Sequence, residues 1–275
     1  MDRKQEYAHL YDSAKTNEEA IRRLIDVVGV LRKECPWDKE QTHESLRKCM
    51  IEEAYEAVDA INNCDSDNLE EEIGDVLLQV VFHSQLGEEA ETFDFVSVTN
   101  RECEKMIRRH PHIFYTENVK TIDKVLEKWE NVKRLEKGSS DYKSDLMNVP
   151  RALPALIRSY KVQSKAAKVG FDWDRVEDAF HKIKEEAEEL EVAYTEKNKE
   201  CIKEELGDLL FSVVNVARFL DVDPEEALNF TSDKFIRRFS YIEDKAKEKG
   251  LELDSMSLNE MDKLWEEAKS LERIK

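Results

Sequence analysis

Acidic side chains stand at helical spacing in two neighbouring segments of the second half of the chain. One segment carries Glu185, Glu186 and Glu189, and the next carries Glu205 and Asp208. Residues three or four positions apart share one face of a helix, so each segment would present its carboxylates together. Carboxylate oxygens are the ligands that hard cations such as Mg²⁺ and Mn²⁺ prefer. The spacing therefore favours a divalent metal site between two helices.

Asp208 strengthens this interpretation because it lies inside the apolar run LGDLLFSVV, which begins at Leu206. An ionised carboxylate taken out of water without a partner carries a large free-energy cost or takes up a proton. Clustered carboxylates in a dry site need a cation to remain ionised together. We therefore expect Asp208 to be desolvated and to bind metal. For the glutamates alone, a solvated acidic helix face is the simpler interpretation.

A di-iron carboxylate bundle is another kind of metal site that helices build, and it needs a Glu-x-x-His motif. The fourth position of the corresponding motif is Asp75 in the first half of the chain and Asp208 in the second, so the match fails. His83 stands further along the same segment as Asp75. We interpret His83 as an ordinary helix histidine.

The acidic pattern occurs twice in the same order, which indicates an internal duplication. MIEEAYEAVDAI (50–61) matches IKEEAEELEVAY (183–194), and EEIGDVLLQVV (71–81) matches EELGDLLFSVV (204–214). In both copies the glutamate of ExxD stands 19 positions after the second glutamate of EExxE. The acidic set of the first copy is Glu53, Glu56, Glu72 and Asp75.

The elements that must position these residues are predicted to be helices. Of the 275 residues, 38% are charged, and there are only 7 Gly and 5 Pro. This composition is typical of an all-helical protein. We expect a first helical unit at 17–137, a polar linker at 138–149 and a second helical unit at 150–275, which would be the main catalytic unit.

The two acidic segments of the second unit should form an antiparallel pair, because the connection around 196–200 is short. Their carboxylates would then face each other. We expect the helices of the first unit at 17–33, 40–63, 67–90, 94–109 and 121–137. In the second unit, Pro150 and Pro154 are consistent with the start of a helix that ends near residue 168, and we expect further helices at 174–196, 199–220, 224–249 and 257–274.

Charge and composition also weigh against several classes of protein. The formal net charge of −19 disfavours unspecific binding to nucleic acid or to an anionic membrane. There is no apolar run of the roughly 18 residues that a membrane span needs, and the start of the chain lacks the apolar core of a signal peptide. The five cysteines show no CxxC spacing, as expected for reduced thiols. We expect a cytoplasmic protein that binds neither nucleic acid nor membranes.

Several stretches in order resemble the MazG family of nucleoside triphosphate pyrophosphohydrolases, in its two-copy bacterial form. Besides the EExxE and ExxD motifs, they are CPWDKEQTHESL (35–46), RRHPHIF (108–114), PRALPALIRSYKVQSKAAKVGFDW (150–173) and EELGDLLFSVVNVAR (204–218). The resemblance implies an all-α fold of tandem duplicated helical-bundle units, assembled as a homodimer. It also implies that nucleoside triphosphates are hydrolysed to a nucleoside monophosphate and pyrophosphate, with Mg²⁺ or Mn²⁺ as cofactor, in the upkeep of nucleotide pools.

The resemblance further implies roles for individual side chains of the second unit. The Mg²⁺ ligands would be Glu186, Glu189, Glu205 and Asp208. The nucleotide contacts would be Lys182, Glu185, Lys234, Arg238, Trp265 and Lys269. Lys203 would substitute for a lysine that related chains carry at the position of Cys201. Either Glu185 or Glu186 would orient the attacking water, and the sequence does not choose between them.

Both units carry the acids, a Lys/Arg pair and a Trp-x-x-x-Lys element, so composition alone does not select the catalytic unit. The first unit offers Lys105, Arg109, Trp129 and Lys133. The resemblance implies that the C-terminal copy is the active one. Lys182 precedes the acids of the second unit, whereas Cys49 stands at the matching position of the first. The alternative function is a non-catalytic sensor of nucleotide or metal that signals through a dimer interface.

Overall fold

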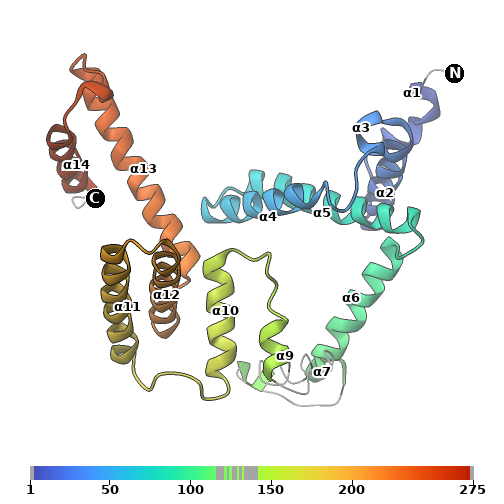
Figure 1. Ribbon diagram of the computed structural model, residues 1–275. Coiled ribbons are helices and arrows are strands. Elements are labelled where there is room, and N and C mark those ends of the chain that lie inside the picture. The colour runs from blue at the N-terminus through green and yellow to red at the C-terminus, as the bar shows by residue number, and fades with distance from the viewer. Residues whose placement is uncertain are drawn as a thin grey trace. The chain divides into compact units, whose positions relative to one another are not determined.

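Every element in the described part of the chain is a helix (Figure 1). The computed structural model describes residues 3–115, 121–122, 124–125, 129, 132 and 142–272. The chain divides into two compact units, Met1–Glu136 and Lys137–Lys275. The all-helical fold class predicted from the composition is confirmed. Most of the helix expected at 121–137, including Lys133, lies outside the described residues.

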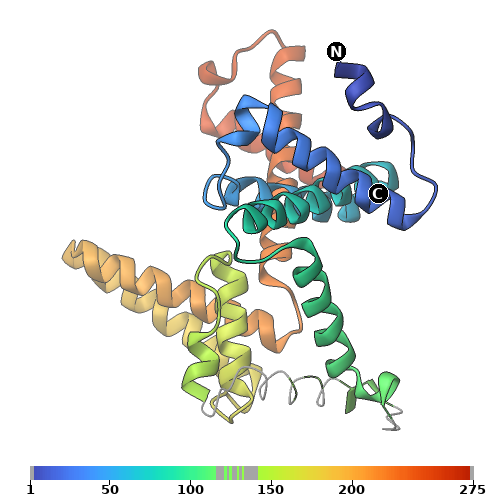
Figure 2. The ribbon, with the colours of Figure 1, turned by 90° about the vertical axis from the view of Figure 1, so that its right-hand side faces the viewer.

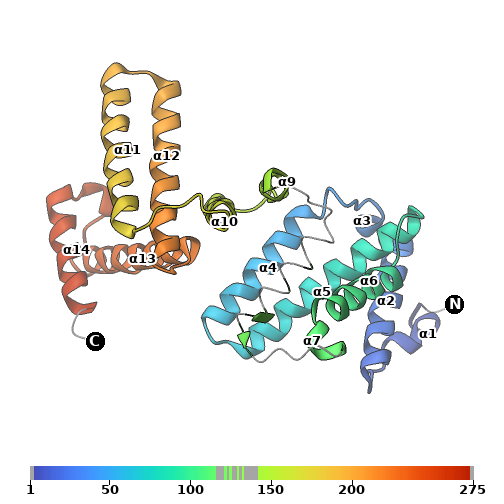
Figure 3. The ribbon, with the colours of Figure 1, turned by 90° about the horizontal axis from the view of Figure 1, so that it is seen from below.

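The first unit is built around an antiparallel pair of helices, α4 and α5, which carry its acidic set (Figure 3). Helix α2 packs against α5, and their buried side chains form a small core that includes Val28, Val81 and Phe82. The elements are α1 (Arg3–Glu6), η1 (Ala8–Leu10), α2 (Asn17–Glu34), α3 (Pro36–Lys39), α4 (Arg47–Asn62), α5 (Ser66–Glu89), α6 (Phe95–Arg109) and α7 (Pro111–Phe114).

The start of α4 differs from the sequence prediction, which placed a helix from residue 40. The helix begins at Arg47 because Thr42 and Ser45 form a turn before it. The Thr42 N–H donates to Ser45 Oγ at 2.9 Å, and the Ser45 N–H donates to Thr42 Oγ1 at 3.2 Å. Such side-chain hydrogen bonds compete with the helical pattern of backbone bonds and favour a turn.

The second unit contains the antiparallel hairpin of α11 and α12, which carries its acidic set, and α10 packs beside α12. The hairpin turn is tight because Lys197 adopts a left-handed conformation at φ 56°. Asn198 then caps α12 by accepting hydrogen bonds from the N–H groups of Glu200 and Cys201. The elements are α9 (Tyr142–Met147), α10 (Ala155–Ala167), α11 (Val176–Glu196), α12 (Lys199–Phe219), α13 (Pro224–Glu248), η2 (Leu253–Ser255) and α14 (Leu258–Glu272).

Helix α10 begins at Ala155, directly after Pro154, the second of the two prolines that the sequence associates with the start of this helix. Pro154 has φ −48° and ψ 143°, an extended conformation from which the helix starts. A proline ring cannot donate the backbone hydrogen bond that a helix interior needs, so it is well placed just before the first turn.

Helix α13 leaves the base of the α11–α12 hairpin and extends away from it (Figure 2). Asp223 caps α13 by accepting from the N–H groups of Glu225 and Glu226, and Pro224 occupies the first turn. Helix α14 folds back onto α13, and the two pack together away from the tip of the acidic hairpin (Figure 3). The unit therefore presents two separate pairs of helices.

Within the described residues, the structure contains no helix that is both long enough and apolar enough to cross a membrane.

Candidate metal centre

Three carboxylates of the second unit converge between α11 and α12. Oxygen atoms of Glu186, Glu205 and Asp208 all lie within 4.8 Å of one another. Glu186 is almost fully buried on α11, while Glu205 and Asp208 are one helical turn apart on α12. A set of oxygen donors at this separation fits a hard divalent cation. The residues present therefore suit the metal that the sequence led us to expect.

Glu189 lies outside this group of three, although the resemblance placed it among the ligands. Its charge nevertheless acts on the site. Burial raises the pKa of Glu205, and the negative charges of Glu189, Glu186 and Asp208 raise it further. A bound cation would offset both effects, because it favours the ionised form of every neighbouring carboxylate.

The expectation that Asp208 is desolvated is wrong for the single chain, in which Asp208 is exposed. The apolar side chains beside it are exposed as well, with 46% of Leu206 and 51% of Leu210 accessible to solvent. Leu206 and Leu210 lie on one side of α12, because residues four apart share a helix face, whereas Asp208 lies on the side that meets Glu186 of α11. Leu206 and Leu210 therefore mark an apolar face of α12 that is exposed in the described part of the chain.

Lys182 joins the acidic cluster from the preceding turn of α11. Its Nζ lies 2.5 Å from Oε1 of Glu186 and 2.8 Å from Oε1 of Glu185. The hydrogen bonds to Glu185 and Glu186 raise the pKa of Lys182, so the lysine remains charged. Lys203, the other lysine expected near the phosphates, is exposed on the early part of α12.

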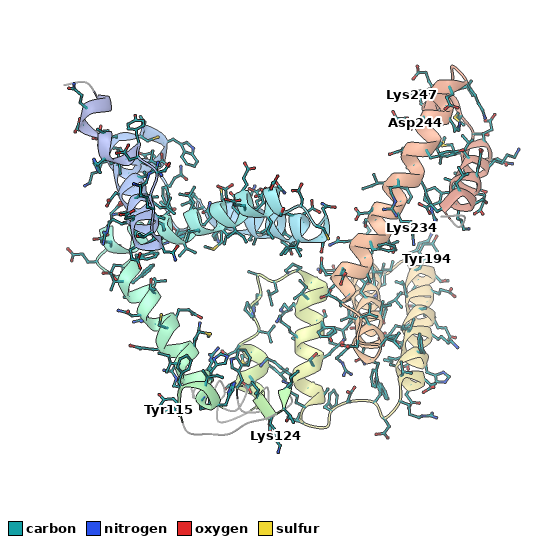
Figure 4. The ribbon with its side chains drawn as sticks, turned by 180° about the vertical axis from the view of Figure 1, so that it is seen from behind. Tyr115, Lys124, Tyr194, Lys234, Asp244 and Lys247 are labelled. Atoms are coloured by element: carbon teal, nitrogen blue, oxygen red, sulfur yellow. The ribbon has the colours of Figure 1, made fainter. Side chains whose placement is uncertain are left out.

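The remaining residues expected to bind nucleotide form a separate cluster on α13 and α14. Arg238 Nε donates to Glu272 Oε2 at 2.8 Å, and the guanidinium lies 5.4 Å from the ring centroid of Trp265. Lys234 lies over the ring of Phe230, and Lys269 pairs with Glu266 at 2.8 Å. Figure 4 shows Lys234 along α13, with Asp244 and Lys247 further toward the end of the helix. The structure thus divides the expected site between the two pairs of helices.

The first unit repeats the acidic cluster with a different neighbour. Oxygen atoms of Glu53, Glu56 and Glu72 lie within 4.8 Å of one another, and Asp75 lies outside this group. Burial raises the pKa of Glu53 and of Glu72, and the charges of the surrounding carboxylates add to the effect. Cys49, at the position that matches Lys182, packs against the apolar core.

Sequence reasoning missed a polar arrangement that supports the first unit. His83 is not isolated, because its Nδ1 lies 2.7 Å from Nδ1 of His43 and the two rings stack at 5.0 Å. Arg32 donates to both carboxylate oxygens of Glu89, at 3.0 and 2.6 Å, and to the carbonyl of Gln41 at 3.2 Å. The spacing of residues along the sequence does not predict contacts such as these, because the partners are far apart in the chain. They attach the stretch CPWDKEQTHESL to α5 beside a cavity of about 490 Å³.

Comparison with known proteins places this arrangement in one family. The MazG nucleotide pyrophosphohydrolase domain matches residues 41–114 and 175–242, which include both acidic clusters. The chain is 42% identical to the nucleoside triphosphate pyrophosphohydrolase/pyrophosphatase MazG of Thermotoga maritima, over 90% of this chain and 94% of that protein. It is 39% identical to the nucleoside triphosphate pyrophosphohydrolase of Escherichia coli K12, over 92% of this chain and 98% of that protein.

A third relative is longer than this chain. The chain is 51% identical to the uncharacterized protein YabN of Bacillus subtilis over 96% of its own length, and it spans about half of that protein, 53%. The double match to one domain confirms the duplication that the sequence indicated. The family resemblance that the motifs suggested is likewise confirmed. The chain belongs to the MazG nucleotide pyrophosphohydrolase family, with two copies of its domain in tandem.

Proposed function

We propose that the chain hydrolyses nucleoside triphosphates to a nucleoside monophosphate and pyrophosphate, with the second unit as the active one and Mg²⁺ or Mn²⁺ as cofactor. One observation carries the proposal: within a MazG domain, oxygens of Glu186, Glu205 and Asp208 lie within 4.8 Å of one another and Lys182 contacts Glu186. The observation supports the proposal because oxygen donors that suit a cation lie beside a positive group that would bind a phosphate. The upkeep of nucleotide pools in the cytoplasm is the role that we assign to the reaction.

The side chains of α11 and α12 would have two roles in the reaction, to bind the cation and to orient the attacking water. Glu186, Glu205 and Asp208, with Glu189 beside them, would hold the cation, which when bound lowers the pKa of a coordinated water and neutralises charge on the phosphates. Glu185 and Glu186 are both close enough to Lys182 to share its ammonium group. Either carboxylate would orient the attacking water and accept its proton.

The cluster on α13 and α14 would bind the phosphates and the base. Lys234 and Arg238 are one turn apart on α13, and Arg favours forked contacts with phosphate oxygens. Trp265 offers an aromatic face, part of which Arg238 covers. Arg238 is already paired with Glu272, so a phosphate would have to replace that carboxylate.

We also propose that a second copy of the chain covers the exposed face of α12 and so forms a homodimer. An uncovered apolar patch of this kind commonly marks an interface. The duplication supports the choice of partner, because Ile73 and Leu77 of the first unit match Leu206 and Leu210 and are exposed in the same way. Sedimentation of the purified chain would test the assembly, and a monomer at micromolar concentration would contradict it.

Release of pyrophosphate from a mixture of nucleoside triphosphates is the experiment that tests the function. We expect release that depends on Mg²⁺ and stops when EDTA is added. Tight nucleotide binding with no pyrophosphate release would favour the alternative, a non-catalytic sensor. The same assay with single nucleotides would define the preferred base and sugar.

A further inference from the structure

Lys182 and a metal ion would compete for one carboxylate of the second unit. The ammonium group of Lys182 lies 2.5 Å from Glu186, whose side chain is only 6% exposed. Glu186 is also the buried member of the group whose oxygens lie within 4.8 Å of one another. Two positive charges at one small carboxylate repel each other, and the repulsion is stronger where water is scarce. The lysine should therefore weaken binding of a cation to the cluster.

Lys182 is also able to move away from Glu186. Its side chain is 33% exposed, and a lysine stem has four rotatable carbons. Its second partner, Glu185, is 57% exposed and lies on the outer side of the cluster. Because Lys182 is already partly exposed, it can move from one anion to another with little change in the buried area of its side chain.

The first unit has a similar acidic cluster with a cysteine at the position that matches Lys182. Glu53, Glu56 and Glu72 are grouped as closely as the acids of the second unit, and Cys49 stands where Lys182 would be. The sulfhydryl group packs into the core and supplies no positive charge. A lysine at this position of the helix is thus not required to bring three carboxylates together.

We propose that Lys182 exchanges Glu186 for a phosphate of the nucleotide when a divalent cation occupies the cluster. This inference rests on the proposed function and extends it. Before the exchange, Lys182 neutralises part of the negative charge on the cluster and weakens binding of the cation. After it, the same ammonium group contacts the substrate. The lysine thereby couples metal binding to nucleotide binding in the second unit.

Binding of Mn²⁺ alone, followed by electron paramagnetic resonance, tests the exchange without any measurement of activity. The protein would carry Glu53→Gln and Glu72→Gln, so that the second unit dominates the signal. In this background we expect Lys182→Met to bind Mn²⁺ about fivefold more tightly, since a competing positive charge has been removed. The same substitution should weaken binding of a non-hydrolysable nucleoside triphosphate. Lys182→Arg keeps the charge and should restore the weaker Mn²⁺ binding.

Lys184→Met is the matched control, because Lys184 is exposed two residues further along α11 and its loss removes the same net charge. It should leave Mn²⁺ affinity unchanged. If Lys182→Met and Lys182→Gln bind Mn²⁺ no more tightly than the control, the exchange is overturned and Lys182 is only a phosphate contact. If the background protein binds no Mn²⁺ and the unmodified chain releases no pyrophosphate, the proposed function fails and the exchange fails with it.

Discussion

The guanidinium of Arg238 lies over the indole ring of Trp265, and the same pairing recurs between Arg109 and Trp129 in the first unit. The distances from guanidinium carbon to ring centroid are 5.4 Å and 5.3 Å. A cation over an aromatic face is a favourable contact. In the second unit the contact helps to hold Trp265, and with it α14, against α13, whatever further contact Arg238 makes with nucleotide.

Glu272 is expected to compete with the substrate for Arg238. The two side chains are joined by hydrogen bonds of 2.7 and 2.8 Å, and only 14% of the Arg238 side chain is exposed. Glu272→Gln removes the competing charge and should tighten binding of a non-hydrolysable triphosphate by about fivefold. Isothermal titration would measure the change. The control is Glu243→Gln, which breaks the ion pair with Lys247 elsewhere on α13 and should leave triphosphate binding unchanged. Weaker triphosphate binding in Glu272→Gln would mean that Glu272 orients Arg238 for the substrate instead of competing with it.

Loss of Asp208 should remove activity without unfolding the chain. Asp208→Asn keeps the size of the side chain and takes away one of three converging carboxylates, so we expect pyrophosphate release to fall by about 100-fold or more. Because Asp208 is exposed, the helical circular dichroism should be retained. Undiminished turnover at saturating Mg²⁺ would remove Asp208 from the metal site.

The raised pKa of Glu205 predicts a particular dependence of stability on pH. Its folded pKa lies above the ordinary value of a glutamate because of burial and of the nearby charges of Glu189, Glu186 and Asp208. The folded state therefore binds the proton more tightly than the unfolded state. In EDTA, this group should destabilise the fold when it is ionised at neutral pH, and the effect should disappear as the pH falls below its unfolded pKa.

Melting temperatures of Glu205→Gln and the unmodified chain, taken from pH 7 to pH 4 in EDTA, would check this prediction. Glu205→Gln should melt higher at pH 7, and the difference should shrink toward pH 4. Glu188→Gln removes an exposed carboxylate from the same hairpin and serves as the control. A lower melting temperature for Glu205→Gln at pH 7 would show that the carboxylate makes a net favourable contact.

The two acidic clusters should differ in their importance for turnover. Glu186→Ala with Glu189→Ala should nearly abolish pyrophosphate release, whereas Glu53→Ala with Glu56→Ala should leave most of it. The reason is that the second cluster has Lys182 in contact with it, at 2.5 Å from Glu186, whereas Cys49 stands at the matching position of the first. A steady-state assay of the two double variants would give the ranking. Equal losses would mean that both units act, and the reverse ranking would assign catalysis to the first.

Local spacing was sufficient to predict the helices and the grouping of the acids. Residues three or four apart on a helix share one face of it. Because the connection Lys197–Asn198 is short, α11 and α12 run antiparallel. The duplication was equally visible, because it is a property of residue order. The predicted start of α4 was too early because the hydrogen bonds between Thr42 and Ser45 form a turn before the helix begins.

Contacts between distant residues could be decided only by the tertiary structure. The apolar run around Asp208 suggested burial, yet Asp208, Leu206 and Leu210 are all exposed. The pairs Arg238–Glu272 and His43–His83 join residues 34 and 40 positions apart. Periodicity reports which side of a helix a residue occupies, but what lies opposite that side depends on how the helices pack, and packing is set by the whole chain.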